Sequence, residues 1–108
     1  MPWAPLLSEA EIVEGLGALP DWRHEGDALV RTIVSPTFLE SIALVNRVAD
    51  AAEAANHHPD ITISWKRVTF SLTTKASKGL TWRDLEMAAT IERLAVGDEP
   101  RSSPKPRR

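Results

Sequence analysis

The chain has 108 residues, which is enough for one modest hydrophobic core and therefore for a single domain. It contains no cysteine, which excludes a disulfide framework, a thiolate metal site and a cysteine nucleophile. The formal net charge is -2, but Arg101, Lys105, Arg107 and Arg108 lie among the last eight positions, so the body before them is distinctly acidic. An acidic body argues against binding of nucleic acid by the fold itself.

The chain divides into a leader, a domain and a tail. Residues 1–7 contain two prolines and no hydrophobic period, and are predicted to be a leader before a domain of residues 8–97. The basic, proline-containing segment 98–108 is predicted to be a disordered tail. No apolar run approaches the length of a membrane span, so no membrane partner is expected. No basic residue precedes Arg23, which argues against a secretory signal and predicts a cytoplasmic protein.

The first predicted helix begins after Ser8. Ser8 and Glu11 have the spacing of a capping box, in which each side chain bonds the other residue's backbone N–H. The helix is predicted to end between residues 16 and 19, where glycines and a proline follow. Its inward-facing residues are expected to be Ile12, Val13 and Leu16.

A hairpin is predicted for residues 22–34. Gly26-Asp27 supplies a turn, and two alternating sets of residues follow it. Both sets contain apolar side chains, so the pattern does not decide which face is buried.

The longest predicted helix begins at Ser35-Pro36, where a capping hydroxyl precedes a proline in the first helical position. It is expected to reach about Ala55, with Asn56 ending it. Its buried stripe is expected to contain Phe38, Ile42, Val45, Ala49 and Ala52.

A second hairpin is predicted for residues 61–74, with Lys66-Arg67 as its two-residue loop. This register pairs Trp65 with Val68, Ile63 with Phe70 and Ile61 with Leu72, and places all six apolar side chains on one face. The opposite face is polar and is expected to face solvent or an interface.

The last predicted helix opens at Thr81 and closes at Gly97. Asp84, at its third position, is favoured there by the helix dipole. The element order is then helix, two strands, helix, two strands, helix. This order predicts an α+β fold in which three helices pack on one face of a four-stranded antiparallel sheet.

The clearest candidates for chemistry are His57 and His58, which lie side by side between a helix and a strand. Imidazoles change protonation near neutral pH. A metal site is not expected, because adjacent histidines rarely point at one ion and no third nitrogen ligand is near in sequence. The alternative is that one imidazole caps the helix and the other is merely exposed. The place where the helix meets the strand, with His57 and His58, is a helix-to-strand corner. Lys75, beyond the fourth strand, is expected near this corner, where it could bind an anion, donate a proton or simply be solvated.

Several motifs in order resemble the pterin-4a-carbinolamine dehydratase family. They are Glu53-x-x-Asn56-His57-His58-Pro59, Trp65 and Val68, Leu72-Thr-Thr74, and Gly79-Leu-Thr-x-x-Asp84. The resemblance covers about residues 22–94. It implies the same α+β fold, a homodimer or homotetramer, and dehydration of 4a-hydroxytetrahydropterin to quinonoid dihydropterin without metal or cofactor.

The resemblance also implies roles for particular residues. His57 and His58 would be catalytic, with His58 as the principal acid/base residue and His57 assisting the leaving hydroxyl or binding the substrate. Lys75 stands where the family has a third histidine, and would protonate or orient the leaving hydroxyl. The remaining residues implied to line the pterin site are Glu53, Pro59, Thr74, Ala76, Ser77, Trp22 and Asp84. The sequence leaves open a different class of function, a non-catalytic pterin-binding or dimerisation module with the same fold.

Overall fold

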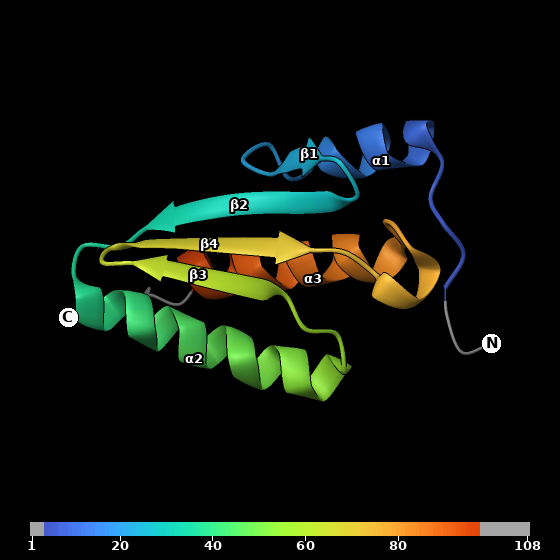
Figure 1. The fold of residues 1–108 in the computed structure, drawn as a ribbon. Helices are drawn as coiled ribbons and strands as arrows, with labels where there is room; N and C mark the ends of the chain where they lie inside the picture. Colours follow the sequence, from blue (N-terminus) through green and yellow to red (C-terminus); the bar gives the residue numbers. More distant parts are fainter. Residues whose placement is uncertain (1–3, 98–108) are drawn as a thin grey trace.

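The structure, a computed structural model, describes residues 4–97 and has the predicted α+β order (Figure 1). The predicted tail and the first three residues of the leader lie outside the described part. The elements are α1 (Glu9–Leu16), β1 (Arg23–Glu25), β2 (Ala28–Val34), α2 (Phe38–Ala55), β3 (Asp60–Ser64), β4 (Arg67–Leu72), the 3-10 helix η1 (Lys75–Ser77), α3 (Trp82–Glu92) and the π-helical turn η2 (Arg93–Gly97).

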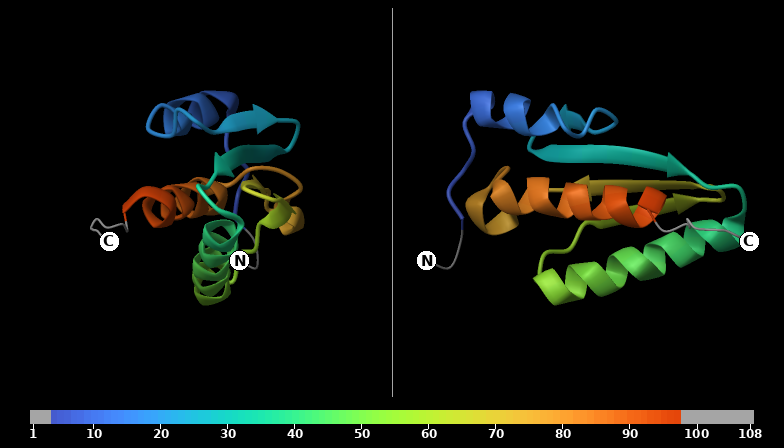
Figure 2. Two further views of the ribbon diagram at one scale, coloured as in Figure 1. Left: turned by 90° about the vertical axis from the view of Figure 1, so that its left-hand side faces the viewer. Right: turned by 180° about the vertical axis from the view of Figure 1, so that it is seen from behind.

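The four strands form one antiparallel sheet in the order β1-β2-β4-β3. Helices α2 and α3 lie along one face of this sheet (Figure 2). Helix α1 meets α3 through Gly15, where an added Cβ would lie 2.5 Å from Leu85 Cδ1. The predicted fold class is therefore confirmed, and the absence of a side chain at Gly15 lets α1 approach α3 closely.

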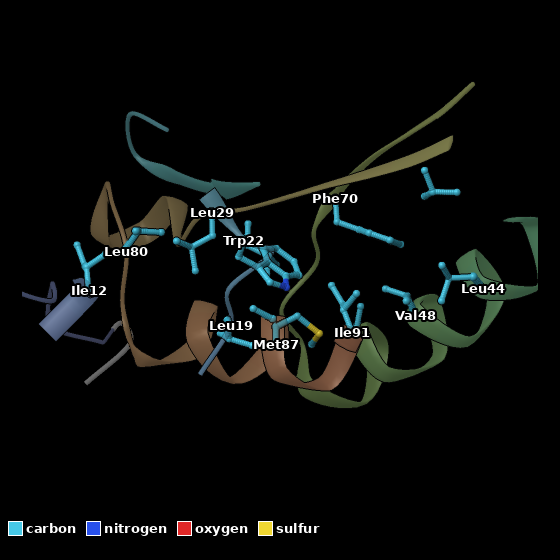
Figure 3. Close-up of a cluster of buried hydrophobic side chains, with 14 residues drawn as sticks. Ile12, Leu19, Trp22, Leu29, Leu44, Val48, Phe70, Leu80, Met87 and Ile91 are labelled. Carbon is cyan, nitrogen blue, oxygen red and sulfur yellow. The ribbon is translucent and has the colours of Figure 1, made fainter. Parts of the chain in front are cut away.

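The hydrophobic core lies between the sheet and the two long helices (Figure 3). From β4 it contains Val68, Phe70 and Leu72, none of which is exposed to solvent, and from β2 it contains the fully buried Leu29. Trp22, just before β1, is 4% exposed and belongs to the same cluster. Burying a large apolar side chain of this kind contributes about 1.5–3 kcal/mol, so β4 is the main apolar anchor of the fold.

The first hairpin agrees with the sequence, and the structure shows which of its faces is buried. Gly26 adopts a φ of 59° in the turn, a conformation that glycine reaches without strain. Leu29 is opposite Leu72 and Ile33 is opposite Val68, so this set of β2 residues faces the core.

The loop predicted for the second hairpin is wrong. The strands end at Ser64 and resume at Arg67, so Trp65 and Lys66 form the turn, with a φ of 57° at Trp65. The pairing shifts by two residues, which places Ile61 opposite Phe70 and Ile63 opposite Val68. A shift of two keeps the strand residues of this set on the core face, so their face was predicted correctly although the register was not. Trp65 itself is 76% exposed.

Two helix predictions also need correction. Thr37, rather than Ser35, caps α2, and its hydroxyl accepts from the backbone N–H of Glu40. The buried residues of α2 are Ser41, Leu44, Val48 and Ala52, so the predicted stripe is rotated by about one residue. Ser41 lies on the buried side of α2 but is polar, so the hydrophobic pattern did not reveal which side is buried.

The first helix follows its predicted cap but not its predicted face. The Ser8–Glu11 capping box is present, and Ile12 is buried. Val13 is 68% exposed, contrary to prediction, because this eight-residue helix covers the core with a narrow side only. Residues 4–7 are bonded to the folded body, since Leu7 N–H donates to Leu80 O and Ala4 is buried. This part of the predicted leader therefore packs with the domain.

Candidate active site

The candidate site is built on the turn that ends α2. Asn56 adopts the left-handed conformation, with φ 51° and ψ 44°, as predicted for the residue that ends this helix. The N–H of His57 donates to Ala52 O at 3.1 Å and that of Asn56 to Glu53 O at 3.2 Å. These two bonds make a Schellman motif, which holds the backbone of His57 against the last turn of the helix.

The imidazole of His57 lies against a buried carboxylate. Its Nε2 is 2.7 Å from Oδ1 of Asp84, whose side chain has no exposed surface, and only 9% of the His57 side chain is exposed. The other carboxylate oxygen, Oδ2, accepts from the Thr74 hydroxyl at 2.8 Å and from the Thr81 N–H at 2.9 Å. Asp84 thus accepts three hydrogen bonds and ties α2, α3 and the loop after β4 together.

The sequence around α3 explains why Asp84 reaches this position. Thr81 is the N-cap, as the sequence predicts, and Asp84 completes a capping box with it. A carboxylate used in this way is fixed by the first turn of the helix. The same fixed carboxylate is then available to orient the imidazole of His57. An imidazole bonded to a carboxylate through Nε2 donates that proton, which leaves Nδ1 as the free acceptor in the neutral ring.

His58 is on the solvent side of the corner. Its Nε2 is 2.6 Å from Oε2 of Glu53, and the side chains of the two residues are 52% and 79% exposed. The structure therefore places the two predicted histidines differently: His57 is buried and His58 is accessible. Each has one ring nitrogen bonded to a carboxylate.

The loop after β4 brings Lys75 to the same end of the molecule. This loop is closed by paired backbone bonds between Thr74 and Gly79. Lys75 Nζ lies 4.0 Å from Oδ1 of Asp60, the first residue of β3, and both side chains are largely exposed. Since Asp60 follows His58 and Pro59 directly, Lys75 lies near the corner as expected.

The other residues implied by the resemblance are divided between two places. Thr74 is buried in the Asp84 network, whereas Ala76 is exposed and Ser77 is half-buried with its hydroxyl donating to Ala4 O. The indole of Trp22 instead donates to Glu92 Oε2 at 3.0 Å. Glu92 lies eight residues beyond Asp84, about 12 Å along α3. The polar end of Trp22 is thus not joined to the histidine corner.

A groove of about 770 Å³ runs between α2 and α3. Of the residues implied to form the site, only His57 lines it; Trp82 and Arg83, the first residues of α3, are also part of its wall. Arg83 was not singled out from the sequence, because it falls on an unspecified position of the Gly79-Leu-Thr-x-x-Asp84 motif. Its contacts with the end of α2, however, are specific.

Within residues 4–97, no group of three or more His, Cys, Asp or Glu side chains is arranged to hold a metal ion. No helix in that range is sufficiently long and apolar to span a membrane.

Comparison with known proteins gives a consistent result. The family model for pterin 4 alpha carbinolamine dehydratase matches residues 5–94. Two bacterial relatives provisionally named as pterin-4-alpha-carbinolamine dehydratases are similar along most of the chain. The relative from Nocardia farcinica is 51% identical over 83% of this chain and 95% of its own length. The relative from Thermosynechococcus vestitus is 50% identical over 86% of this chain and 98% of its own length.

A solved structure is similar in fold and in sequence. The crystal structure of a transcriptional coactivator/pterin dehydratase from Brucella melitensis has a TM-score of 0.81 and 29% identity. The match covers 83% of this chain and 98% of that one. The chain therefore belongs to the pterin-4a-carbinolamine dehydratase family.

Proposed function

We propose that this protein dehydrates a 4a-hydroxytetrahydropterin to the quinonoid dihydropterin, with His57 and His58 as its acid/base residues. The observation that carries the proposal is the pair of carboxylate-bonded imidazoles at one corner of a family member. His57 is bonded to the buried Asp84 and His58 to the exposed Glu53. Both arrangements orient a titratable ring, and orientation is a requirement of general acid–base catalysis.

The reaction is an elimination of water. A base removes the proton from the ring nitrogen, the nitrogen electron pair forms a C=N bond, and the C4a–O bond breaks. The departing hydroxyl takes a proton from a general acid and leaves as water. No electrons are gained or lost overall, so the chemistry requires proton transfer groups and no redox cofactor.

His58 is the principal acid/base residue in this proposal. About half of its side chain is exposed, so it is accessible to a substrate at the corner. The Nε2–H of His58 donates a hydrogen bond to Glu53, which leaves Nδ1 available to take a proton from the substrate.

His57 assists the leaving hydroxyl. Its ring is held by Asp84 from one side and its backbone by the Schellman motif from the other. A residue with so little freedom keeps its remaining nitrogen in one direction, which lowers the entropic cost of aligning it with the substrate.

Lys75 replaces the third histidine of the family in this proposal. Its ammonium group can donate a proton or a hydrogen bond to the leaving hydroxyl but has no lone pair to accept one. Its exposed position opposite Asp60 is compatible with a substrate at the mouth of the site. The pocket would be completed by Pro59 and by the backbone of Thr74, Ala76 and Ser77.

The test is the dehydration rate of freshly generated 4a-carbinolamine with the wild-type protein and its Lys75→His variant. The wild type is expected to exceed the uncatalysed rate, and Lys75→His to be faster still because histidine can both donate and accept. If both proteins are inactive, the dehydratase proposal fails. Pterin binding without turnover would then support a non-catalytic binding module.

We also propose that the protein forms a homo-oligomer through the β3 edge of its sheet. β3 is an edge strand, so its outer backbone groups have no partner strand within the described chain. Ile63 is 39% exposed on this strand, and Trp65 is 76% exposed in the turn that follows it. An exposed edge strand with apolar side chains is a template for pairing with another chain. A second copy of the protein is the proposed partner.

A further inference from the structure

We propose that Arg83 is a positioning residue for the catalytic corner. It would hold the backbone at the end of α2 in the conformation that presents His57 and His58. This inference rests on the proposed dehydratase function for its kinetic consequence, but its structural consequence can be measured without any activity.

The guanidinium of Arg83 bonds the carbonyls of the last residue of α2 and of the residue that follows it. Its Nη2 donates to Ala55 O at 3.2 Å and to Asn56 O at 2.9 Å. Carbonyls at the end of a helix have no partner inside the helix and carry partial negative charge. A cation from another helix therefore satisfies two acceptors and complements the helix dipole at the same point.

The position of Arg83 in sequence gives this contact its importance. Arg83 and Asp84 are neighbours in the first turn of α3, and both reach the same corner. Asp84 holds the imidazole of His57, while Arg83 holds the carbonyls of the two residues that precede it. The first turn of α3 thus fixes both the side chain and the backbone of the catalytic segment.

The backbone at this corner needs such support. Asn56 is in the left-handed region, which asparagine tolerates but in which any residue other than glycine has limited stability. Without Arg83, the peptide groups on both sides of Asn56 can reorient, and His58 moves with them. His57 remains bonded to Asp84, so the two imidazoles lose their fixed relation to each other.

The surroundings of Arg83 also provide a way to test its role chemically. Arg83 lines the groove of about 770 Å³ between α2 and α3. In an Arg83→Ala variant, a guanidinium ion added at millimolar concentration can enter this groove and occupy the vacated position. Recovery of kcat and of the histidine NMR signals with guanidinium but not with urea would show that a planar cation at this position is needed to hold the backbone at the end of α2.

The experiment compares wild type, Arg83→Ala and Arg83→Lys by dehydration kinetics and by NMR of the histidine side chains. For Arg83→Ala we expect kcat to fall about tenfold or more, because displacements near 1 Å can cost about 100-fold, with a smaller change in KM. The imidazole signals of His57 and His58 should shift. Guanidinium should restore both readouts in part, and Arg83→Lys should lie between wild type and Arg83→Ala.

Arg47 provides a matched control. Its Nη2 donates to Leu94 O at 3.2 Å, so it too bonds a carbonyl near the end of a helix, but away from the corner. Arg47→Ala should leave the histidine signals and kcat unchanged even if it lowers stability.

The outcomes separate the two proposals. Unchanged histidine signals and unchanged kcat in a folded Arg83→Ala protein would overturn the positioning role. A wild-type protein without dehydratase activity would overturn the proposed function, and the histidine signals alone would then decide the role of Arg83. If Arg83→Ala does not fold, Arg83→Lys, which keeps the charge but not the planar shape, decides between the same outcomes by the same two readouts.

Discussion

At the scale of single residues, Asp84 has two roles: it caps α3 together with Thr81, and it orients the imidazole of His57. The spacing of the sequence reveals only the first. Its place in a capping box is visible from its spacing to Thr81. Its bond to His57 is not, because 27 residues separate the two positions. Only the packing of α3 against the end of α2 brings the carboxylate and the imidazole together. Resemblance to a family identified both residues, while the physical link between them required the structure.

The variant Asp84→Asn tests this dual task. An amide has one oxygen acceptor and introduces a donor, so it cannot accept all three hydrogen bonds that the carboxylate accepts. Because the site is fully buried, the free energy of unfolding should fall by about 1–3 kcal/mol, and the dehydration rate should fall with the lost orientation of His57. Urea unfolding and the kinetic assay measure the two effects.

Asp50→Asn, which changes an exposed carboxylate on α2, serves as the control and should change neither quantity. Wild-type stability in Asp84→Asn would show that the buried network around His57 is not as the structure describes it.

At the scale of elements, local chemistry predicted most helix ends better than it predicted helix faces, with the start of α2 as the exception. The caps at Ser8 and Thr81 and the end at Asn56 follow from side chains that bond nearby backbone groups. The inward face of α2 was misplaced because Ser41, a polar residue, lies on it and is fully buried. A hydrophobic period cannot reveal an inner position that is occupied by a hydroxyl.

The turn between β3 and β4 shows the same limit in another form. Left-handed turn positions are usually predicted from glycine or asparagine, and here the position is taken by Trp65. The alternation of apolar residues predicted the buried face, because a shift of two residues does not change it. The exact partners across the hairpin depend on the turn, and the turn carries no signal in the sequence.

At the scale of the whole molecule, one end carries the candidate site and the opposite end of the sheet carries exposed apolar side chains. Val34 at the end of β2, Leu39 near the start of α2 and Trp65 in the hairpin turn are all more than 60% exposed. Apolar surface of this kind, beside an open edge strand, favours association with another chain.

We expect the variant Ile63→Lys to weaken self-association. A charged side chain on an edge strand opposes pairing with a second copy, and 39% exposure of Ile63 lets lysine reach solvent without unfolding the domain. Sedimentation velocity should show an oligomer for the wild type and a shift toward monomer for Ile63→Lys.

Val13→Lys, at an exposed position on α1, is the control and should keep the wild-type oligomer. A wild-type protein that sediments as a monomer at all concentrations would contradict the proposed edge pairing.

The most direct test of the central claim is the dehydration rate of freshly generated 4a-carbinolamine with wild type and His58→Ala, using His24→Ala on the exposed β1 strand as the control. We predict a wild-type rate well above the uncatalysed one, the same rate for His24→Ala, and a loss of about 100-fold or more for His58→Ala with its fold intact. Full activity in His58→Ala would contradict the proposed role of His58 and remove it from the mechanism.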